Sequence, residues 1–142
     1  MKKIMGTLIL ILFTSLLQAP PNNASVIFAS EGMNPFENLF KAVCQVESSG
    51  NPFAYNATDQ KGGSWGIVQI GESMLNAFNA ENRTNFVLND CFDVSVSRSI
   101  FMWHFQKQHP DIEAASRSWN GGRDWKRKKS TARYFAKVKY YL

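Results

Sequence analysis

The chain has 142 residues, of which 44% are hydrophobic, 13% aromatic and 19% charged, and its formal net charge is +5. This composition is typical of a globular domain and excludes a disordered, fibrous or collagen-like chain. The length leaves room for one hydrophobic core and not for a second.

The first 30 residues have the pattern of a secretory signal peptide followed by a short leader. Lys2 and Lys3 precede an apolar run from Ile4 to Leu17, which matches the charged and apolar regions of such a signal. At about 14 residues the run is shorter than the roughly 20 that a membrane-spanning helix needs. We therefore expect an exported protein, periplasmic or extracellular, whose folded domain comprises residues 31–142. An uncleaved N-terminal anchor is the alternative.

The first helix of the domain is predicted to begin after Asn34 and to end near Ser48. Asn34 can cap this helix, Pro35 suits its first position, and Glu37 completes a capping-box-like pattern. The Gly-Asn-Pro sequence at 50–52 prevents its continuation. Between these signals, apolar side chains recur at spacings of three and four residues and therefore share one helix face. They are Phe36, Leu39, Phe40, Val43 and Val46.

The rest of the chain indicates further helices and one small β element. A polar segment (51–63) precedes an apolar run (65–70), which fits either a short strand or the entry to a helix. Weaker helical patterns cover residues 72–79, 93–108, 111–119 and 131–141, with candidate N-caps at Asp93, Asp111 and either Ser130 or Thr131. The predicted fold class is therefore mainly α with a small β element.

The two cysteines, Cys44 and Cys91, leave two interpretations open. Disulfides persist in exported proteins, and a bridge between these cysteines would close a loop of about fifty residues, worth roughly 4 kcal/mol in the chain-entropy account. Two unpaired thiols, with Cys44 packed in the core, fit the sequence equally well. Two thiols without a histidine cluster make a poor metal site.

Most of the excess positive charge lies near the C-terminus. From position 117 onward a single acid, Asp124, stands against a series of basic residues. They are Arg117, Arg123, Lys126, Arg127, Lys128, Lys129, Arg133, Lys137 and Lys139. A basic surface suits an anionic polymer such as a cell wall or nucleic acid, although an ordinary solvated face explains any one of these residues as well.

Glu47 lies on the apolar face of the first predicted helix. It follows Val43 by four residues and Cys44 by three, so it projects from the apolar stripe, whereas Glu37 and Lys41 point away from it. Burial disfavours the ionised form of a carboxylate and raises its pKa. A raised pKa suits a general acid that protonates a glycosidic oxygen near neutral pH. The alternative is a helix-terminal glutamate that swings into solvent.

Three short segments together resemble the soluble lytic transglycosylase and goose-type lysozyme superfamily. Residues 46–56, Val-Glu-Ser-Ser-Gly-Asn-Pro-Phe-Ala-Tyr-Asn, resemble its active-site signature, in which a helix ends in a catalytic Glu followed by Ser and a Gly-Asn-Pro turn. Residues 66–70, Gly-Ile-Val-Gln-Ile, are similar to its Gly-Leu-Met-Gln-Ile block. Residues 118–122, Ser-Trp-Asn-Gly-Gly, are similar to its Tyr-Asn-Ala-Gly block. The three segments occur in the family's order and span nearly the whole expected domain.

The resemblance implies a lysozyme-like α+β fold with a substrate cleft, and it gives roles to five residues. Glu47 matches the catalytic acid/base, Ser48 the neighbouring serine, and Gln69 a residue that lines the sugar groove. Asn120 matches the asparagine of the third block. Trp119 stands where the family usually has Tyr, and we expect it to bind sugar because indole offers a donor and a stacking face but no acid or base. The alternatives are structural: a core tryptophan, a turn asparagine, and backbone hydrogen bonds for Ser48 and Gln69.

The expected activity is cleavage of peptidoglycan glycan strands between N-acetylmuramic acid and N-acetylglucosamine. Most glycosidases use two carboxylates, and Asp59 is the further candidate, although its surroundings read as an ordinary turn. The resemblance implies a lytic transglycosylase that needs only Glu47, because the substrate's N-acetyl group assists departure of the leaving group and its 6-hydroxyl then forms a 1,6-anhydro end. Water in place of that hydroxyl would give a hydrolytic muramidase.

No metal or cofactor is expected, because His104 and His109 accompany neither a nucleophile pattern nor a metal-ligand cluster and are assigned to structure. The expected partner is the peptidoglycan strand, bound by a monomer, and the resemblance implies a possible association with a secretion or conjugation apparatus. The alternative from another class is a non-catalytic wall-binding or assembly protein. Nucleic-acid binding is weakly supported, because no recognisable module accompanies the basic run.

Overall fold

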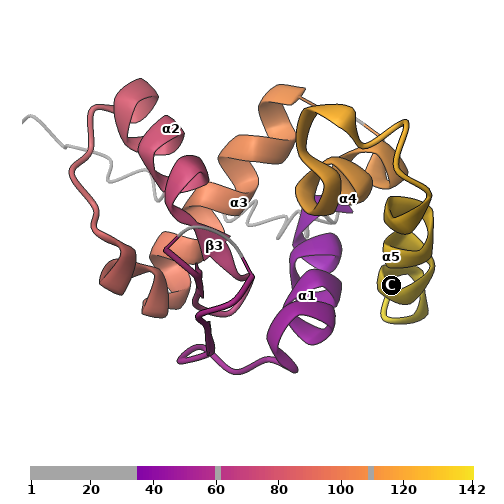
Figure 1. The fold of residues 1–142 in the computed structure, drawn as a ribbon, viewed down its shortest axis with the longest axis horizontal. Coiled ribbons are helices and arrows are strands. Elements are labelled where there is room, and N and C mark those ends of the chain that lie inside the picture. Colours follow the sequence, from indigo (N-terminus) through magenta and orange to yellow (C-terminus); the bar gives the residue numbers. More distant parts are fainter. Residues whose placement is uncertain (1–34, 60–61, 109–110) are drawn as a thin grey trace, which may run out of the picture.

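Helices make up most of residues 35–59, 62–108 and 111–142, the part of the chain that this computed structural model describes (Figure 1). The expected signal segment and the Asn34 cap lie outside these residues. The helices are α1 (Pro35–Ser48), α2 (Glu72–Asn82), α3 (Val94–Gln108), α4 (Ile112–Gly121) and α5 (Lys129–Tyr140), with short 3-10 helices η1 (Leu88–Phe92) and η2 (Gly122–Asp124). The predicted mainly α fold with a small β element is confirmed.

The small β element is an antiparallel sheet in the order β1-β2-β3. Its strands are β1 (Tyr55–Asn56), β2 (Ser64–Trp65) and β3 (Ile70–Gly71). Trp65 pairs with Tyr55 on one side and with Ile70 on the other. The apolar run 65–70 is therefore neither one strand nor a helix entry, because it contains the end of β2, a tight turn and the start of β3.

Glycine is required in that turn at Gly66. Its φ is +78°, a region that other residues adopt only with strain. A Cβ atom at Gly66 would lie 1.9 Å from the backbone oxygen of Cys91 in η1. Close approach of two backbones thus fixes the β2–β3 turn against η1, and Gln69, which also has a positive φ of 56°, completes the turn.

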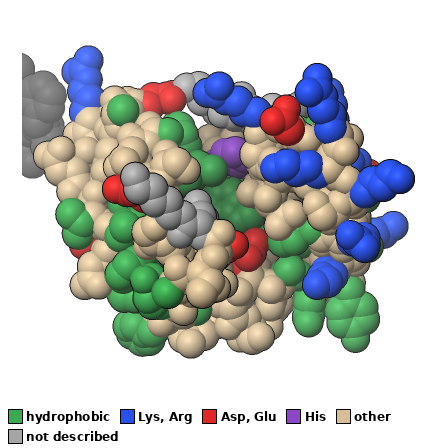
Figure 2. Space-filling view, viewed as in Figure 1, with side chains coloured by type: hydrophobic (Ala, Val, Ile, Leu, Met, Phe, Trp, Pro, Cys, Tyr) green, Lys and Arg blue, Asp and Glu red, His purple; other side chains and the backbone are tan. Residues whose placement is uncertain are grey.

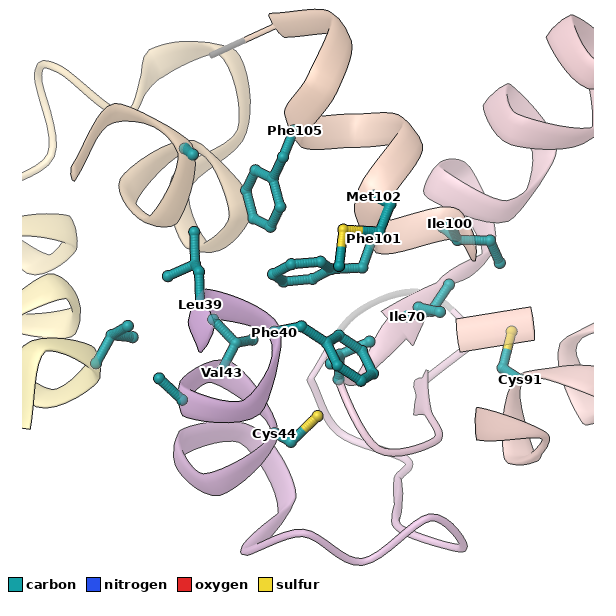
Figure 3. Close-up of a cluster of buried hydrophobic side chains, with 14 of the residues drawn as sticks. Leu39, Phe40, Val43, Cys44, Ile70, Cys91, Ile100, Phe101, Met102 and Phe105 are labelled. Atoms are coloured by element: carbon teal, nitrogen blue, oxygen red, sulfur yellow. The ribbon is translucent and has the colours of Figure 1, made fainter. Parts of the chain in front are cut away.

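The core forms where the apolar face of α1 meets α3, α5 and β3 (Figure 3). The predicted stripe is confirmed in Leu39, Phe40 and Val43, all of which are buried. Phe101 and Phe105 of α3 are fully buried beside them, and the ring of Phe101 packs edge-on against that of Phe40 at a centroid distance of 5.1 Å. No helix among the described residues combines the length and the apolar character needed to cross a bilayer.

Both cysteines belong to this buried region and neither forms a disulfide. Cys44 comes from α1 and Cys91 from η1, and each thiol is free (Figure 3). Burial raises the pKa of both thiols to about 12. Of the two interpretations that the sequence leaves open, the structure agrees with two unpaired thiols.

The predicted N-caps have different outcomes. Asp111 is confirmed, because its side chain accepts hydrogen bonds from two backbone N–H groups in the first turn of α4 at 2.7 and 3.3 Å. Asp93 likewise accepts a backbone N–H at the start of α3, at 2.7 Å. The prediction of Ser130 or Thr131 is wrong, because α5 begins earlier with Lys128 as its N-cap residue. The Thr131 hydroxyl is instead buried and contacts backbone carbonyls in the turn before the helix.

Candidate active site

Glu47 lies in the last turn of α1 and contacts the C-terminal helix. The hydroxyl of Tyr134 donates a hydrogen bond to Glu47 Oε1 at 2.6 Å. Tyr134 is only 8% exposed and belongs to the buried face of α5 together with Thr131 and Val138. The packing of α5 against α1 therefore brings together two side chains that are far apart in the sequence, and it fixes the direction of the carboxyl group.

The surroundings of Glu47 keep its carboxyl group partly protonated at neutral pH. Burial raises its pKa to about 7, the Tyr134 hydrogen bond acts in the opposite direction, and the negative charge of Asp59 adds to the increase. Burial and the nearby Glu47 carboxylate raise the pKa of the Tyr134 hydroxyl, so that it stays protonated and remains a donor. A carboxyl group with a pKa near 7 can both release and take up a proton near neutral pH.

A cleft of about 400 Å³ opens beside Glu47. Figure 2 shows the hollow, with acidic side chains at one edge and Lys and Arg side chains gathered over the α4–α5 side. Its walls come from the end of α1, the start of α2, α3 and the end of α4, and the side chains that line it include Glu47, Asp59, Gln69, His104, Trp119 and Asn120. The structure therefore brings four of the five predicted site residues, Glu47, Gln69, Trp119 and Asn120, to one cavity.

Ser48, the fifth predicted residue, does not line this cleft. Its hydroxyl donates to the backbone oxygen of Ile67 at 2.7 Å and contacts the oxygen of Cys44 at 3.2 Å. Ile67 lies in the β2–β3 turn that also carries Gln69. Ser48 thus ties the end of α1 to this turn, which corresponds to the backbone-bonding alternative that the sequence leaves open.

Gln69 and Trp119 combine structural contacts with a place in the cleft wall. Gln69 Nε2 donates to the backbone oxygens of Gly66 at 2.9 Å and Ala54 at 3.3 Å, so the side-chain amide braces its own turn. Trp119 Nε1 donates to the oxygen of Val68 at 3.3 Å, and its ring lies 5.3 Å from that of Phe101. One side of the Trp119 ring system is therefore anchored in the core. Part of its surface stays accessible.

The sequence-based assignment of the site does not include Tyr134, which bonds to Glu47, or His104 and Ser118, which line the cleft. A sequence signal for Tyr134 exists, because Thr131, Tyr134 and Val138 have the spacing of one helix face. Burial of that face also buries the Tyr134 hydroxyl, which then needs a hydrogen-bond partner. The sequence assigns His104 to structure, and the residue is indeed buried, with its Nε2 3.3 Å from the hydroxyl of Ser118. His104 and Ser118 nevertheless also line the cleft. His104 belongs to α3 and Ser118 to α4, so no pattern within one helix predicts that they line the same cleft.

Asp59 reaches the cleft from the segment between β1 and β2. Its side chain is exposed and accepts a hydrogen bond from the hydroxyl of Ser64. Its charge is one of the causes that raise the pKa of Glu47. The segment around Asp59, which resembles an ordinary turn in the sequence, therefore places a second carboxylate in the cavity that contains Glu47. In the described part of the chain, no three His, Cys, Asp or Glu side chains group so as to hold a metal ion.

In a comparison with known protein families, residues 25–142 match the transglycosylase SLT domain. The chain belongs to this family, and the superfamily resemblance and the lysozyme-like fold expected from the sequence are confirmed. Membership implies, for the family as a whole, peptidoglycan as substrate and cleavage of the lytic transglycosylase type. No curated protein and no solved structure matched the chain.

Proposed function

We propose that this protein cleaves the bond between N-acetylmuramic acid and N-acetylglucosamine as a lytic transglycosylase, with Glu47 as its only acid/base. The observation that carries the proposal is the Glu47 carboxyl group itself: it lines a cleft, is oriented by the Tyr134 hydroxyl at 2.6 Å, and has a pKa raised to about 7. A group in this setting has the protonation state that a general acid needs.

The reaction uses Glu47 twice. In the first step its carboxyl group gives a proton to the glycosidic oxygen, the bond from that oxygen to the muramic C1 breaks, and the oxygen of the substrate's own N-acetyl group bonds to C1. In the second step the Glu47 carboxylate takes the proton of the sugar's 6-hydroxyl. The oxygen of that hydroxyl bonds to C1 and displaces the N-acetyl oxygen. The product carries a 1,6-anhydro ring, no water is consumed, and Glu47 is protonated again.

The other cleft residues hold the strand in this proposal. Trp119 offers the accessible part of its indole to a sugar face, and Asn120 and Gln69 offer amide groups to hydroxyl and acetamido groups. Ser48 acts as a positioning residue, because the hydrogen bond from its hydroxyl to the backbone of Ile67 fixes the turn that carries Gln69. The proposal also includes export by a signal in residues 1–30, a domain of residues 31–142, and action as a monomer.

Asp59 supports a second candidate activity, hydrolysis by a muramidase mechanism. Its carboxylate lines the cleft that contains Glu47, and glycosidases that use water commonly pair an acid with such a second carboxylate. In that case Glu47 would protonate the glycosidic oxygen as its bond to C1 breaks, and Asp59 would take a proton from the water molecule whose oxygen bonds to C1. The product would then have an ordinary reducing end and would be heavier than the anhydro product by one water.

Mass spectrometry of the fragments released from purified sacculi tests both candidates. We expect anhydro ends from the native protein, about 10²- to 10⁴-fold less product from Glu47→Gln, and near-native product from Asp59→Asn. Reducing ends that disappear with Asp59→Asn would establish the muramidase instead. Binding to sacculi without any released fragment would contradict both and favour a non-catalytic wall-binding protein.

A further inference from the structure

Beside the cleft, a second cavity of about 440 Å³ is lined by two basic side chains of α5. Arg133 and Lys137 stand one helical turn apart, so they project from the same side of the helix. Asn120, Ser130 and Tyr134 complete the lining. Because Tyr134 also holds Glu47, the two cations flank the side chain that orients the proton donor.

The cavity adjoins the cleft at Asn120. This residue lines both cavities, and its side chain is exposed. A polymer lying in the cleft against Glu47 can therefore send a branch over Asn120 towards Arg133 and Lys137. The cavity is placed to receive a substituent of the sugar at the cleavage point rather than a further sugar of the main strand.

The positive charge of this cavity is not neutralised by the protein. Among the described residues, neither Arg133 nor Lys137 forms an ion pair, whereas Arg98 and Arg117 each pair with a glutamate. Asp124 is the only acid in the sequence from position 117 onward, and Figure 2 shows Lys and Arg side chains gathered on this side of the hollow. Exposed cations without partners, side by side, favour an anionic ligand.

We propose that Arg133 and Lys137 bind the carboxylates of the peptide stem on N-acetylmuramic acid, an inference that rests on the proposed function. In peptidoglycan only the muramic sugar carries this branch, and the stem ends in free carboxylates. The fork of an arginine matches a carboxylate with two parallel hydrogen bonds, and a lysine adds a compact charge. The pocket therefore makes the enzyme prefer strands that still carry their stems and sets the muramic sugar in register at Glu47.

Binding measured without cleavage separates this inference from the catalytic one. In a Glu47→Gln background, Arg133→Gln/Lys137→Gln is compared with Lys41→Gln/Lys139→Gln, which removes the same charge from positions that do not line the pocket. Calorimetry uses three ligands: glycan strands with stems, strands freed of stems by an amidase, and neutral chitohexaose. Circular dichroism and thermal unfolding check that the variants fold alike.

We expect the Arg133/Lys137 variant to bind stem-bearing strands about fivefold to tenfold more weakly, in line with partly exposed charge-assisted contacts. Its affinity for chitohexaose and for stripped strands should stay within about twofold of the control, and the salt dependence of its binding to stem-bearing strands should weaken. An equal loss with stripped strands would assign the pocket to the lactyl carboxylate and overturn the stem assignment. Unchanged affinity, or an equal loss from the control variant, would overturn the site.

Discussion

A hydrogen bond joins α1 and α5 at the point where chemistry is proposed to occur. The Tyr134 hydroxyl donates to Glu47 Oε1 at 2.6 Å, whereas position 119, where the family usually has Tyr, is occupied by Trp in this chain. The tyrosine hydroxyl beside Glu47 therefore comes from α5 and not from position 119, so Trp at position 119 does not leave the proposed acid without such a partner.

Replacing Tyr134 with Phe should shift the pH profile of activity. The hydroxyl stabilises the ionised form of Glu47, so its removal raises the Glu47 pKa above its value of about 7. Because the first step needs the protonated acid, the alkaline limb of the pH–rate profile should move to higher pH, while the maximum rate falls about tenfold through lost orientation. Muropeptide release from pH 5 to 9 measures this, with the exposed Tyr140→Phe as control. An unmoved or lowered limb would contradict the assignment.

Glu47 should also make folding depend on pH. Its folded pKa of about 7 lies above its ordinary value of 4.5, so the folded state binds the proton more tightly than the unfolded chain. The stabilisation is complete below pH 4.5 and is lost as pH rises through 7. Between pH 4.5 and pH 8 the free energy of unfolding of the native protein should fall by roughly 3 kcal/mol more than that of Glu47→Gln. Urea unfolding of both proteins at pH 4.5, 6 and 8 gives this difference, and a constant difference would refute the raised pKa.

At the level of elements, the β2–β3 turn links α1 to η1. Ser48 attaches the end of α1 to the turn at Ile67, and Gly66 lets the turn approach the backbone of η1. Gln69 stands at the end of the same turn and lines the cleft. The geometry of one cleft wall thus depends on backbone contacts that leave no room for a side chain.

The substitutions Gly66→Ala and Gly122→Ala separate crowding from backbone strain. Both glycines have a positive φ, but a Cβ at Gly122 meets no atom within 4 Å, whereas one at Gly66 would lie 1.9 Å from a backbone oxygen. Strain alone should cost about 2 kcal/mol in Gly122→Ala. Gly66→Ala should lose roughly a further 2 kcal/mol or more, because η1 must move. Thermal unfolding compares them; equal losses would show that the contact with η1 is unimportant.

Features that depend on a repeating pattern within one helix could be predicted from the sequence, whereas features that depend on contacts between elements could not. The apolar spacing of α1 places Glu47 beside buried Val43 and Cys44, and the helix ends at Ser48 as the glycine and proline signals indicate. The split of residues 65–70 into two strand ends was missed, because its cause is the backbone of η1 far along the chain. For the same reason the sequence does not predict that Tyr134 contacts Glu47 or that His104 lines the cleft: tertiary packing, not local sequence, places them there.

For the molecule as a whole, the closed core determines the behaviour of the thiols. Cys44 and Cys91 are buried with pKa values raised to about 12, so neither should react with an aromatic disulfide reagent at pH 8 while the protein is folded. In denaturant both thiols should react at once. Labelling followed by intact mass measures the number modified. Rapid labelling of the folded protein, or no labelling after unfolding without reductant, would contradict two buried free thiols.

The contact between α1 and α5 also has a consequence for biosynthesis. Glu47 is synthesised 87 residues before its partner Tyr134, so the pair cannot assemble until α5 has left the ribosome. Fragments that end before Tyr134 would carry Glu47 without the group that aims it. The proposed activity should therefore appear only once α5 has packed against α1, and removal of α5 by a protease should abolish it.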